Sequence, residues 1–258
     1  MSDKQRLDVL LLALGLAPSR EKARALIMAG EVLVDGRSLD KTGTLVRAEA
    51  SVEIKARPRF VSRGGDKLAA ALAAFPLDAG GQICADVGAS TGGFTDCLLQ
   101  HGAAKVYAID VGYGQIAYGL RTDPRVVVLE RTNVRHLAQL AEPVSLVVMD
   151  ASFISLRLLL PVVQGWLAPG SGSIIPLIKP QFEAGPQDVG KGGVVRDPAV
   201  HSRVLAEVLT FALSIGLGVH GLIRSPLKGP AGNIEFLAWL RNGVPGADDV
   251  TPLIEAVI

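Results

Sequence analysis

The feature that most constrains the fold is an alternation of apolar runs and helix-like segments through the last two thirds of the chain. Seven apolar runs have the length and composition of buried strands. They span residues 83–87, 106–110, 126–129, 144–150, 174–179, 219–224 and 234–240. Because helix-like segments separate most of them, the pattern predicts a mostly parallel α/β sheet. Ligands of such sheets bind beyond the carboxyl ends of the strands.

A glycine-rich turn, DVGASTGGFT at 86–95, follows the first of these strands. Gly88, Gly92 and Gly93 let the backbone turn tightly and approach a ligand, and a helix is expected from Phe94. The spacing differs from the dinucleotide fingerprint G-x-G-x-x-G, and no P-loop lysine is present, which argues against a nucleotide hydrolase. Any tight turn from strand to helix favours glycine, so the motif depends on its context.

The second predicted strand ends at Asp110, 24 residues after Asp86. An acidic residue at this place can accept two hydrogen bonds from the ribose hydroxyls of a bound cofactor. The alternative is that Asp110 caps the N-terminus of a helix.

Four charged residues stand at the ends or borders of the predicted elements. Lys179 ends an apolar run, where a buried lysine is costly unless it is paired. Asp150 ends the neighbouring run, Glu235 lies in the last predicted strand, and Lys67 lies in a helix before the first strand. In this topology all four can converge on one cleft, where each charge has an opposite partner. The alternative is a set of unrelated charges, each near water.

The first 63 residues form a more basic segment, with 12 Lys and Arg against 8 Asp and Glu, whereas the remainder holds 14 against 17. Apolar spacing predicts a helix over 6–14 and a second helix that Ser19 caps. An Asp-Gly pair at 35–36 predicts a hairpin, and residues 50–56 a further strand. These elements make a small α+β module, and Pro58 with the Gly64-Gly65 pair marks a junction after it.

The basic residues of this module have two interpretations. They are a solvated helix face, or they form a surface that binds the phosphates of a polyanion. The candidate residues for such a phosphate-binding surface are Arg6, Arg20, Lys22, Arg24, Arg37 and, at the junction, Arg63. Three motifs favour the second interpretation: Arg6-Leu7-Asp8, SREKARALI at 19–27 and GEVLVDG at 30–36. They resemble the S4 RNA-binding domain, which implies structured RNA as the ligand. RNA helices are recognised mainly through shape, phosphates and 2′-hydroxyls.

The rest of the chain resembles class I S-adenosylmethionine-dependent methyltransferases, and its glycine-rich turn is similar to that of FtsJ-like 2′-O-ribose methyltransferases. Lys67, Asp150, Lys179 and Glu235 match the Lys-Asp-Lys-Glu tetrad of that group. In order, SRGGDKL, DVGASTGGFTD, LIKPQFE and GNIEFL resemble the TlyA family, whose members were named haemolysins and methylate cytidine 2′-hydroxyls in ribosomal RNA. The segment PRFV at 58–61 departs from the family's commonest form, which puts signalling through it in doubt.

The resemblance implies a fold and a domain order. We expect an S4-like domain over 1–56, a linker over 57–63, and a Rossmann-like class I methyltransferase domain with a seven-stranded sheet over 64–258. It implies S-adenosylmethionine as cofactor, ribosomal RNA or a ribosomal subunit as partner, and no metal. Asp86 would face the methionine end of the cofactor, Asp110 its ribose, and Asn133 its adenine, although a turn asparagine is equally consistent. The remaining implied cofactor contacts are Gly88, Ser90, Thr91, Gly92, Gly93, Phe94 and Asp150.

The implied catalytic roles are Lys179 as general base, Asp150 as the group that orients it, and Lys67 and Glu235 as groups that hold the ribose 2′-hydroxyl. Lys67 opposes protonation of Lys179, whereas both carboxylates favour it, so the base assignment is a hypothesis. The loop over 180–197 is expected to be a mobile flap that orders on RNA, with Lys191 and Arg196 near phosphates. An ordinary surface loop is the alternative.

Other features restrict the class of protein. Cys84 and Cys97 stand in apolar settings and are expected to be buried thiols. The sequence shows no signal peptide and no uncharged run long enough to cross a bilayer, which predicts a cytoplasmic protein. The alternatives to a methyltransferase are an RNA-binding or ribosome-assembly factor whose methyltransferase domain is inactive, and a membrane-active haemolysin. The N-terminal module disfavours a small-molecule methyltransferase.

Overall fold

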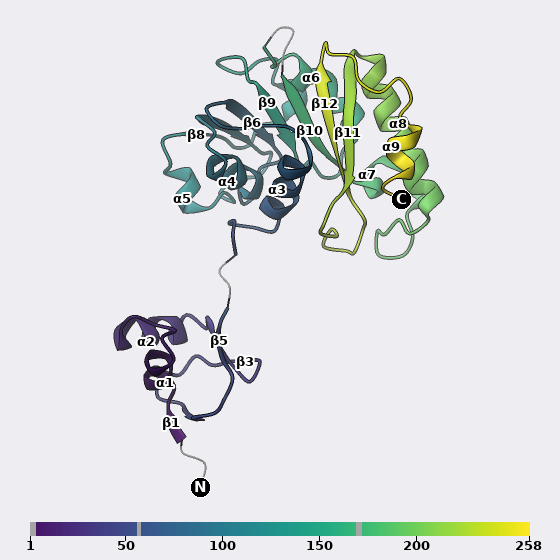
Figure 1. Ribbon diagram of the computed structural model, residues 1–258. Coiled ribbons are helices and arrows are strands. Elements are labelled where there is room, and N and C mark those ends of the chain that lie inside the picture. Colours follow the sequence, from purple (N-terminus) through teal and green to yellow (C-terminus); the bar gives the residue numbers. More distant parts are fainter. Residues whose placement is uncertain (1–3, 56–57, 169–171) are drawn as a thin grey trace. The chain divides into compact units, whose positions relative to one another are not determined.

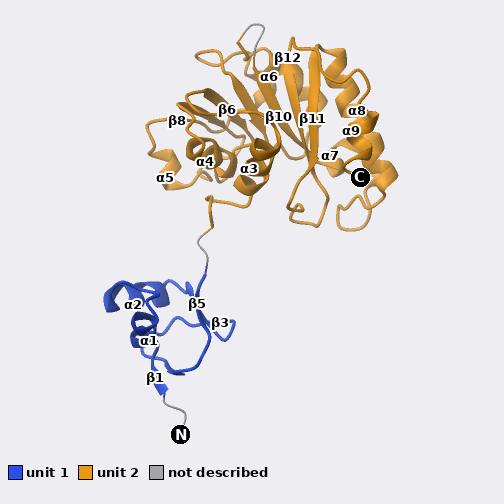
Figure 2. Cartoon of the chain, viewed as in Figure 1, with its two compact units in different colours: residues 1–57 blue, residues 58–258 orange. Residues whose placement is uncertain are grey.

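The computed structural model describes residues 4–55, 58–168 and 172–258. The chain divides into two compact units, residues 1–57 and residues 58–258, which Figure 2 shows in different colours. The border between the predicted first domain and the linker, at residues 56 and 57, lies outside the described residues.

Over its described residues, 4–55, unit 1 holds two helices and two small sheets. Its elements are β1 (Lys4–Arg6), α1 (Leu7–Ala13), α2 (Arg20–Met28), β2 (Val32–Val34), β3 (Arg37–Ser38), β4 (Leu45–Arg47) and β5 (Val52–Ile54). Strand β1 pairs with β4, and β2 lies between β3 and β5. The predicted cap is confirmed, because Ser19 Oγ accepts a hydrogen bond from the Lys22 N–H. The predicted hairpin is confirmed too: Asp35 and Gly36 have φ of 47° and 76°, as a type I′ turn requires.

Over residues 58–168 and 172–258, unit 2 is an α/β domain built on one seven-stranded sheet (Figure 1). Its strands are β6 (Ile83–Val87), β7 (Lys105–Ile109), β8 (Val126–Leu129), β9 (Leu146–Met149), β10 (Ser173–Ile178), β11 (Leu217–Arg224) and β12 (Phe236–Asn242). Its helices are α3 (Gly64–Ala74), α4 (Gly93–Gln100), α5 (Tyr118–Arg121), α6 (Leu156–Gln164), α7 (Pro180–Glu183), α8 (Pro198–Ser214) and α9 (Thr251–Glu255), with short 3-10 turns η1 (Val134–His136) and η2 (Pro186–Asp188). Each strand overlaps one of the seven predicted runs.

The strand order is β11-β12-β10-β9-β6-β7-β8. The neighbours from β10 to β8 pair in parallel, whereas β12 is antiparallel to both β10 and β11. The predicted mostly parallel sheet is therefore confirmed. Because β12 runs the other way, its first residues lie at the edge where the parallel strands end.

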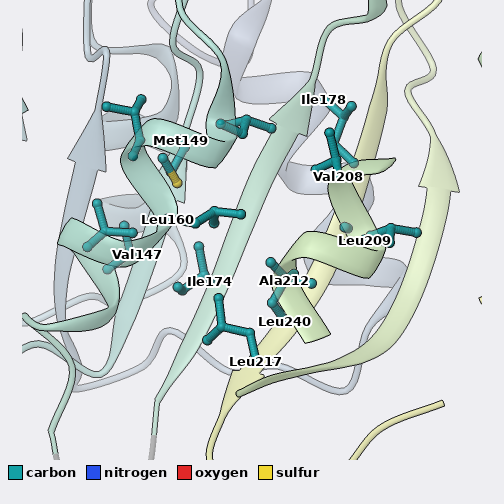
Figure 3. Close-up of a cluster of buried hydrophobic side chains, with 14 of the residues drawn as sticks. Val147, Met149, Leu160, Ile174, Ile178, Val208, Leu209, Ala212, Leu217 and Leu240 are labelled. Atoms are coloured by element: carbon teal, nitrogen blue, oxygen red, sulfur yellow. The ribbon is translucent and has the colours of Figure 1, made fainter. Parts of the chain in front are cut away.

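Hydrophobic side chains cover both faces of this sheet. Helices α3, α4 and α5 pack on one face, and α6, α8 and α9 pack on the other. Figure 3 shows the second cluster, where Leu160 of α6 and Leu209 of α8 lie over Val147, Ile174 and neighbouring strand residues. A sheet that is buried on both faces explains why its central strands are continuous apolar runs.

The glycine pair at 64–65 differs from its predicted role. The sequence marks it as a junction, but it forms the first turn of α3. Phe60 is 3% exposed and packs against this turn, and a Cβ on Gly65 would lie 2.2 Å from its Cγ. Glycine is therefore required for close packing at this place.

Candidate active site

The four charged residues of the predicted tetrad form two ion pairs at the carboxyl edge of the sheet. Lys179 follows β10 and its Nζ lies 2.6 Å from Oδ1 of Asp150, which follows β9. The Nζ of Lys67, in α3, lies 2.5 Å from Oε2 of Glu235. All four line one cleft of about 270 Å³. The prediction that they converge is confirmed, and each desolvated lysine has an acidic partner.

Glu235 lies one residue before β12, although the sequence predicted it inside a strand. The antiparallel direction of β12 is what brings it to the carboxyl edge. There the residue is 2% exposed, and its Oε1 accepts a long hydrogen bond of 3.5 Å from Gln181.

Two polar residues near the lysines were missed by the sequence analysis. Ser152 Oγ accepts a hydrogen bond of 2.8 Å from Lys179 Nζ and lines the same cleft. Ser62 also lines the cleft, and its Oγ would lie 2.2 Å from a Cβ on Gly93. The signal for Ser152 is its position two residues after Asp150, at a strand end that faces the cleft.

The glycine-rich turn joins β6 to α4 along one wall of the cleft. Of the predicted cofactor contacts, the cleft is lined by Gly88, Ser90, Thr91, Gly93 and Phe94. Gly88 has a φ of 82°, and a Cβ there would lie 2.8 Å from the carbonyl oxygen of Asp150. Gly92 does not line the cleft; it precedes α4 with a φ of 96°, and a Cβ would meet Leu120. These glycines thus serve tight packing as well as access.

Asp110 lines a second cavity of about 400 Å³, which shares Gly88, Ser90, Asp150 and Ser152 with the first. Its Oδ2 accepts a hydrogen bond of 2.8 Å from the Ser90 N–H, and its Oδ1 accepts one of 2.6 Å from the Gly112 N–H. The alternative that Asp110 caps a helix is wrong, because the next helix, α5, begins at Tyr118.

Asn133 lines the same cavity and also has a local role. Its Oδ1 accepts a hydrogen bond from the Arg135 N–H at the start of η1. Both interpretations that the sequence allowed, a turn residue and a residue at the cofactor cavity, are therefore compatible with its position.

Asp86 lies beneath the glycine-rich turn and lines neither cavity. It is 0% exposed, and its Oδ2 accepts a hydrogen bond of 2.7 Å from Thr95 Oγ1 of α4. Its Oδ1 is buried without a hydrogen-bond partner among the residues that the structure describes. Burial, with a smaller effect from Asp150, raises the pKa of Asp86 to about 7. The predicted position facing the cleft is not what the structure shows; Asp86 ties β6 to α4.

The candidate RNA-binding residues are divided between the units. Arg6, Arg20 and Arg24 gather around Asp8 in unit 1. Lys22 and Arg37 are exposed on the same unit. Arg63 belongs to unit 2, where it precedes α3 and lines the cleft of the tetrad.

The segment over 180–197 is tied to its surroundings by side chains. Glu183 accepts hydrogen bonds from Ser155 Oγ (2.6 Å) and the Leu156 N–H (2.7 Å) at the start of α6. Asn233 accepts from the Val195 N–H and donates to the Gly193 carbonyl. Lys191 and Arg196 are exposed on it, and its ordering by RNA stays a prediction.

Cys84 and Cys97 are free and buried, as predicted, and burial raises the pKa of each thiol to about 12. Across residues 4–55, 58–168 and 172–258, no cluster of three or more His, Cys, Asp or Glu has a metal-binding arrangement. Within the same ranges, no helix has the length and apolar character needed to cross a membrane.

Comparison with known proteins assigns this arrangement to a class. The sequence pattern of FtsJ-like methyltransferases matches residues 60–242, and that of the S4 domain matches residues 5–52. The chain therefore belongs to the FtsJ-like methyltransferases and carries an S4 domain. Within that class it belongs to the TlyA family, as the resemblance predicted.

The relatives match over nearly the whole chain. The 16S/23S rRNA (cytidine-2′-O)-methyltransferase TlyA of Mycobacterium tuberculosis is 46% identical, over 100% of this chain and 97% of its own length. Hemolysin A of Brachyspira hyodysenteriae is 39% identical, over 90% and 98%. The solved structure of a candidate hemolysin from Streptococcus thermophilus has 43% identity and a TM-score of 0.73, over 100% of this chain and 95% of that one.

Proposed function

We propose that this protein transfers a methyl group from S-adenosylmethionine to the 2′-hydroxyl of a cytidine in ribosomal RNA. The observation that carries the proposal is the meeting of two Lys–acid ion pairs with the glycine-rich turn in one cleft. The name of the M. tuberculosis relative supports the nucleotide and the RNA class. The S4 domain supports binding to structured RNA. A ribosomal substrate would be met in the cytoplasm, which is where we propose that the protein acts.

The residues at the two joined cavities fit S-adenosylmethionine. Apolar side chains of Val111, Ile154 and Leu159 offer a wall for an adenine ring, and Asn133 lies on the same cavity. Both oxygens of Asp110 already hold backbone N–H groups, which fixes the carboxylate while it keeps lone pairs for ribose hydroxyls. Asp150 lines both cavities, where its carboxylate suits the positive sulfonium. The bound cofactor would supply an electrophilic methyl group.

The tetrad would prepare the ribose hydroxyl for in-line attack. The neutral amine of Lys179, formed when its ammonium group releases a proton to solvent, would take the hydroxyl proton, because a 2′-hydroxyl is a weak nucleophile at neutral pH. Asp150 and Ser152 both contact the Nζ of Lys179 and would aim it. Lys67, fixed by Glu235, would bind the ribose oxygen and keep it in line. Such positioning alone can supply several kcal/mol.

Methyl transfer to unmodified ribosomal RNA tests the proposal. Transcribed 16S and 23S RNA, and ribosomal subunits from cells that lack this protein, would be incubated with S-adenosylmethionine labelled in its methyl group. We expect label on a cytidine ribose, detected as a nucleotide bond that resists alkaline hydrolysis. Label on a base, or no label on any of these substrates with folded protein, would overturn the proposal.

A further inference from the structure

Three arginines of unit 1 share one buried carboxylate. The Nε atoms of Arg6, Arg20 and Arg24 lie 3.0, 2.9 and 3.1 Å from the carboxylate oxygens of Asp8. The Asp8 side chain is 0% exposed, while the three arginine side chains are 43%, 48% and 47% exposed. The hydrogen bond from Arg6, with those from Arg20 and Arg24, holds the pKa of Asp8 well below its usual range despite burial.

These residues come from three elements that the apolar core fixes. Arg6 ends β1, Asp8 lies in the first turn of α1, and Arg20 and Arg24 are one turn apart on α2. The core of unit 1 places α1 against α2, so the carboxylate stands beneath all three guanidinium groups. Three positive charges on one negative charge leave this surface with an excess of positive charge.

Most donors of the three guanidinium groups make no hydrogen bond to Asp8. Arg20 and Arg24 each use only Nε, and Arg6 uses Nε and, at 3.3 Å, Nη2. In the part of the chain that the structure describes, Asp8 is the only recorded partner of Arg20 and Arg24. The Nη groups of a guanidinium form a planar fork that matches a phosphate. Because each guanidinium group is held through its Nε and is about half-exposed, its Nη groups are available to bind an anion.

We propose that Asp8 is a positioning residue that holds Arg6, Arg20 and Arg24 as one preformed site for phosphodiester groups of RNA. That the RNA is ribosomal rests on the proposed function; the phosphate site itself rests on this geometry. An unrestrained arginine loses rotamer freedom when it binds, and fixing it beforehand removes that cost. Phosphate binding at this site thus depends on the guanidinium Nη groups and on the Asp8 carboxylate that fixes them. Positive charge alone would not give the same affinity.

Lysine substitutions separate the contribution of guanidinium geometry to RNA binding from that of positive charge. Arg20→Lys and Arg24→Lys keep the charge, but one ammonium cannot bond Asp8 and present a fork to phosphate together. In filter binding of the full-length protein to transcribed 23S RNA, we expect each variant to bind about tenfold more weakly, the loss of about one charge-assisted hydrogen bond. Arg47→Lys is the matched control, because Arg47 is exposed on β4 of the same unit and, among the described residues, the ion pairs of Asp8 are with Arg6, Arg20 and Arg24. Equal affinity of all three variants and the wild type would overturn the proposal.

Asp8→Asn should change RNA affinity in opposite directions, depending on whether the surface acts by charge alone or Asp8 positions the arginines. It adds one positive charge to the surface, so a face that acts by charge alone would bind RNA more tightly. The proposal predicts binding about tenfold weaker, because the forks lose their anchor. Asp40→Asn makes the same change of charge at an exposed residue of unit 1 and should not weaken binding. If Asp8→Asn fails to fold by circular dichroism, the two lysine variants, which retain the carboxylate, decide the question.

The same samples keep this inference apart from the proposed function. Methyl transfer would be measured in parallel with saturating RNA. Intact transfer by the wild type together with unchanged affinity in the lysine variants overturns only the role of Asp8. Weakened binding in those variants, with no methyl transfer by the wild type, supports the phosphate site and overturns the proposed function.

Discussion

Lys179 is the residue on which the proposed chemistry depends most directly. Lys179→Ala should lower the rate of methyl transfer by about 10²–10⁴, the usual loss for a positioned base, and leave cofactor affinity near that of the wild type. Lys179→Arg should not restore the rate, because a guanidinium stays protonated and cannot accept the proton. Single-turnover methylation with saturating cofactor and RNA is the measurement.

The matched control is Lys105→Ala. Lys105 also forms a 2.5 Å ion pair, with Glu142, but it begins β7 at the opposite edge of the sheet. It should transfer methyl groups at the wild-type rate. An arginine variant at 179 with nearly full rate would show that this position acts as a fixed positive charge, and the proton acceptor would then be Asp150 or water.

Asp86 gives a prediction for the pH dependence of stability. Its pKa is about 7 in the folded chain, against an ordinary value near 3.9, so between these values the folded state binds more protons than the unfolded state. The free energy of unfolding from this group therefore falls as pH rises through that window. Asp86→Asn removes the titration and should gain stability relative to the wild type, by up to a few kcal/mol, between pH 5 and pH 7.5.

Urea unfolding at the two pH values measures this difference. Asp248→Asn, at an exposed position of the same unit, is the control and should follow the wild type at both values. A variant at Asp86 that tracks the wild type from pH 5 to pH 7.5 would contradict the prediction.

At this scale the sequence predicted charged residues better than neutral ones. Lys179 and Asp150 were recognisable because a charge that ends an apolar run needs an explanation. Ser152 and Thr95 were missed because hydroxyl residues near strand and helix ends are common and carry no such cost. Asp86 was placed at the cleft by resemblance, whereas only coordinates show how deeply a residue inside a strand is buried.

At the scale of elements, the start of α3 is a sensitive place. Gly65→Ala should lower the free energy of unfolding by about 1–3 kcal/mol, because the added methyl group overlaps the ring of Phe60. It should also lower methyl transfer, since the displaced turn leads directly to Lys67. Gly119→Ala is the control: it lies in α5 with nothing within 4 Å of its Cβ, and should be neutral or slightly stabilising. Thermal unfolding and single-turnover rates of both variants check this.

The positions of the strands were predicted correctly from the sequence. The direction of β12 and the role of the glycine pair at 64–65 were not. All seven strands lie within two residues of their predicted bounds, because a strand buried on both faces is a continuous apolar run. That β12 runs antiparallel could not be predicted, since apolar composition is the same for either direction. The glycine pair at 64–65 was mistaken for a junction because glycine breaks helices in general, and its close contact with Phe60 is a tertiary effect.

At the scale of the whole molecule, the change from a basic to an acidic composition predicted two parts, and the chain does form two compact units. The residue at which unit 2 begins decides which fragment of the chain can be isolated in folded form. The linker was predicted over 57–63, of which the structure describes residues 58–63. Within unit 2, Phe60 is buried in the core, the Val61 N–H donates to Asp96 Oδ2 at 2.8 Å, and Gln100 donates to the Arg59 carbonyl.

We therefore expect the fragment over 58–258 to fold and bind S-adenosylmethionine, and the fragment over 64–258 to be less stable. Loss of a buried phenylalanine side chain typically costs about 3–5 kcal/mol, and here it also frees the first turn of α3. That turn lies against Gly93 of the glycine-rich turn, so cofactor affinity should fall with stability. Thermal unfolding and calorimetric titration of both fragments, with the full-length protein as reference, give the comparison. Equal stability and affinity of the two fragments would show that residues 58–63 are a linker in the energetic sense, despite their packing.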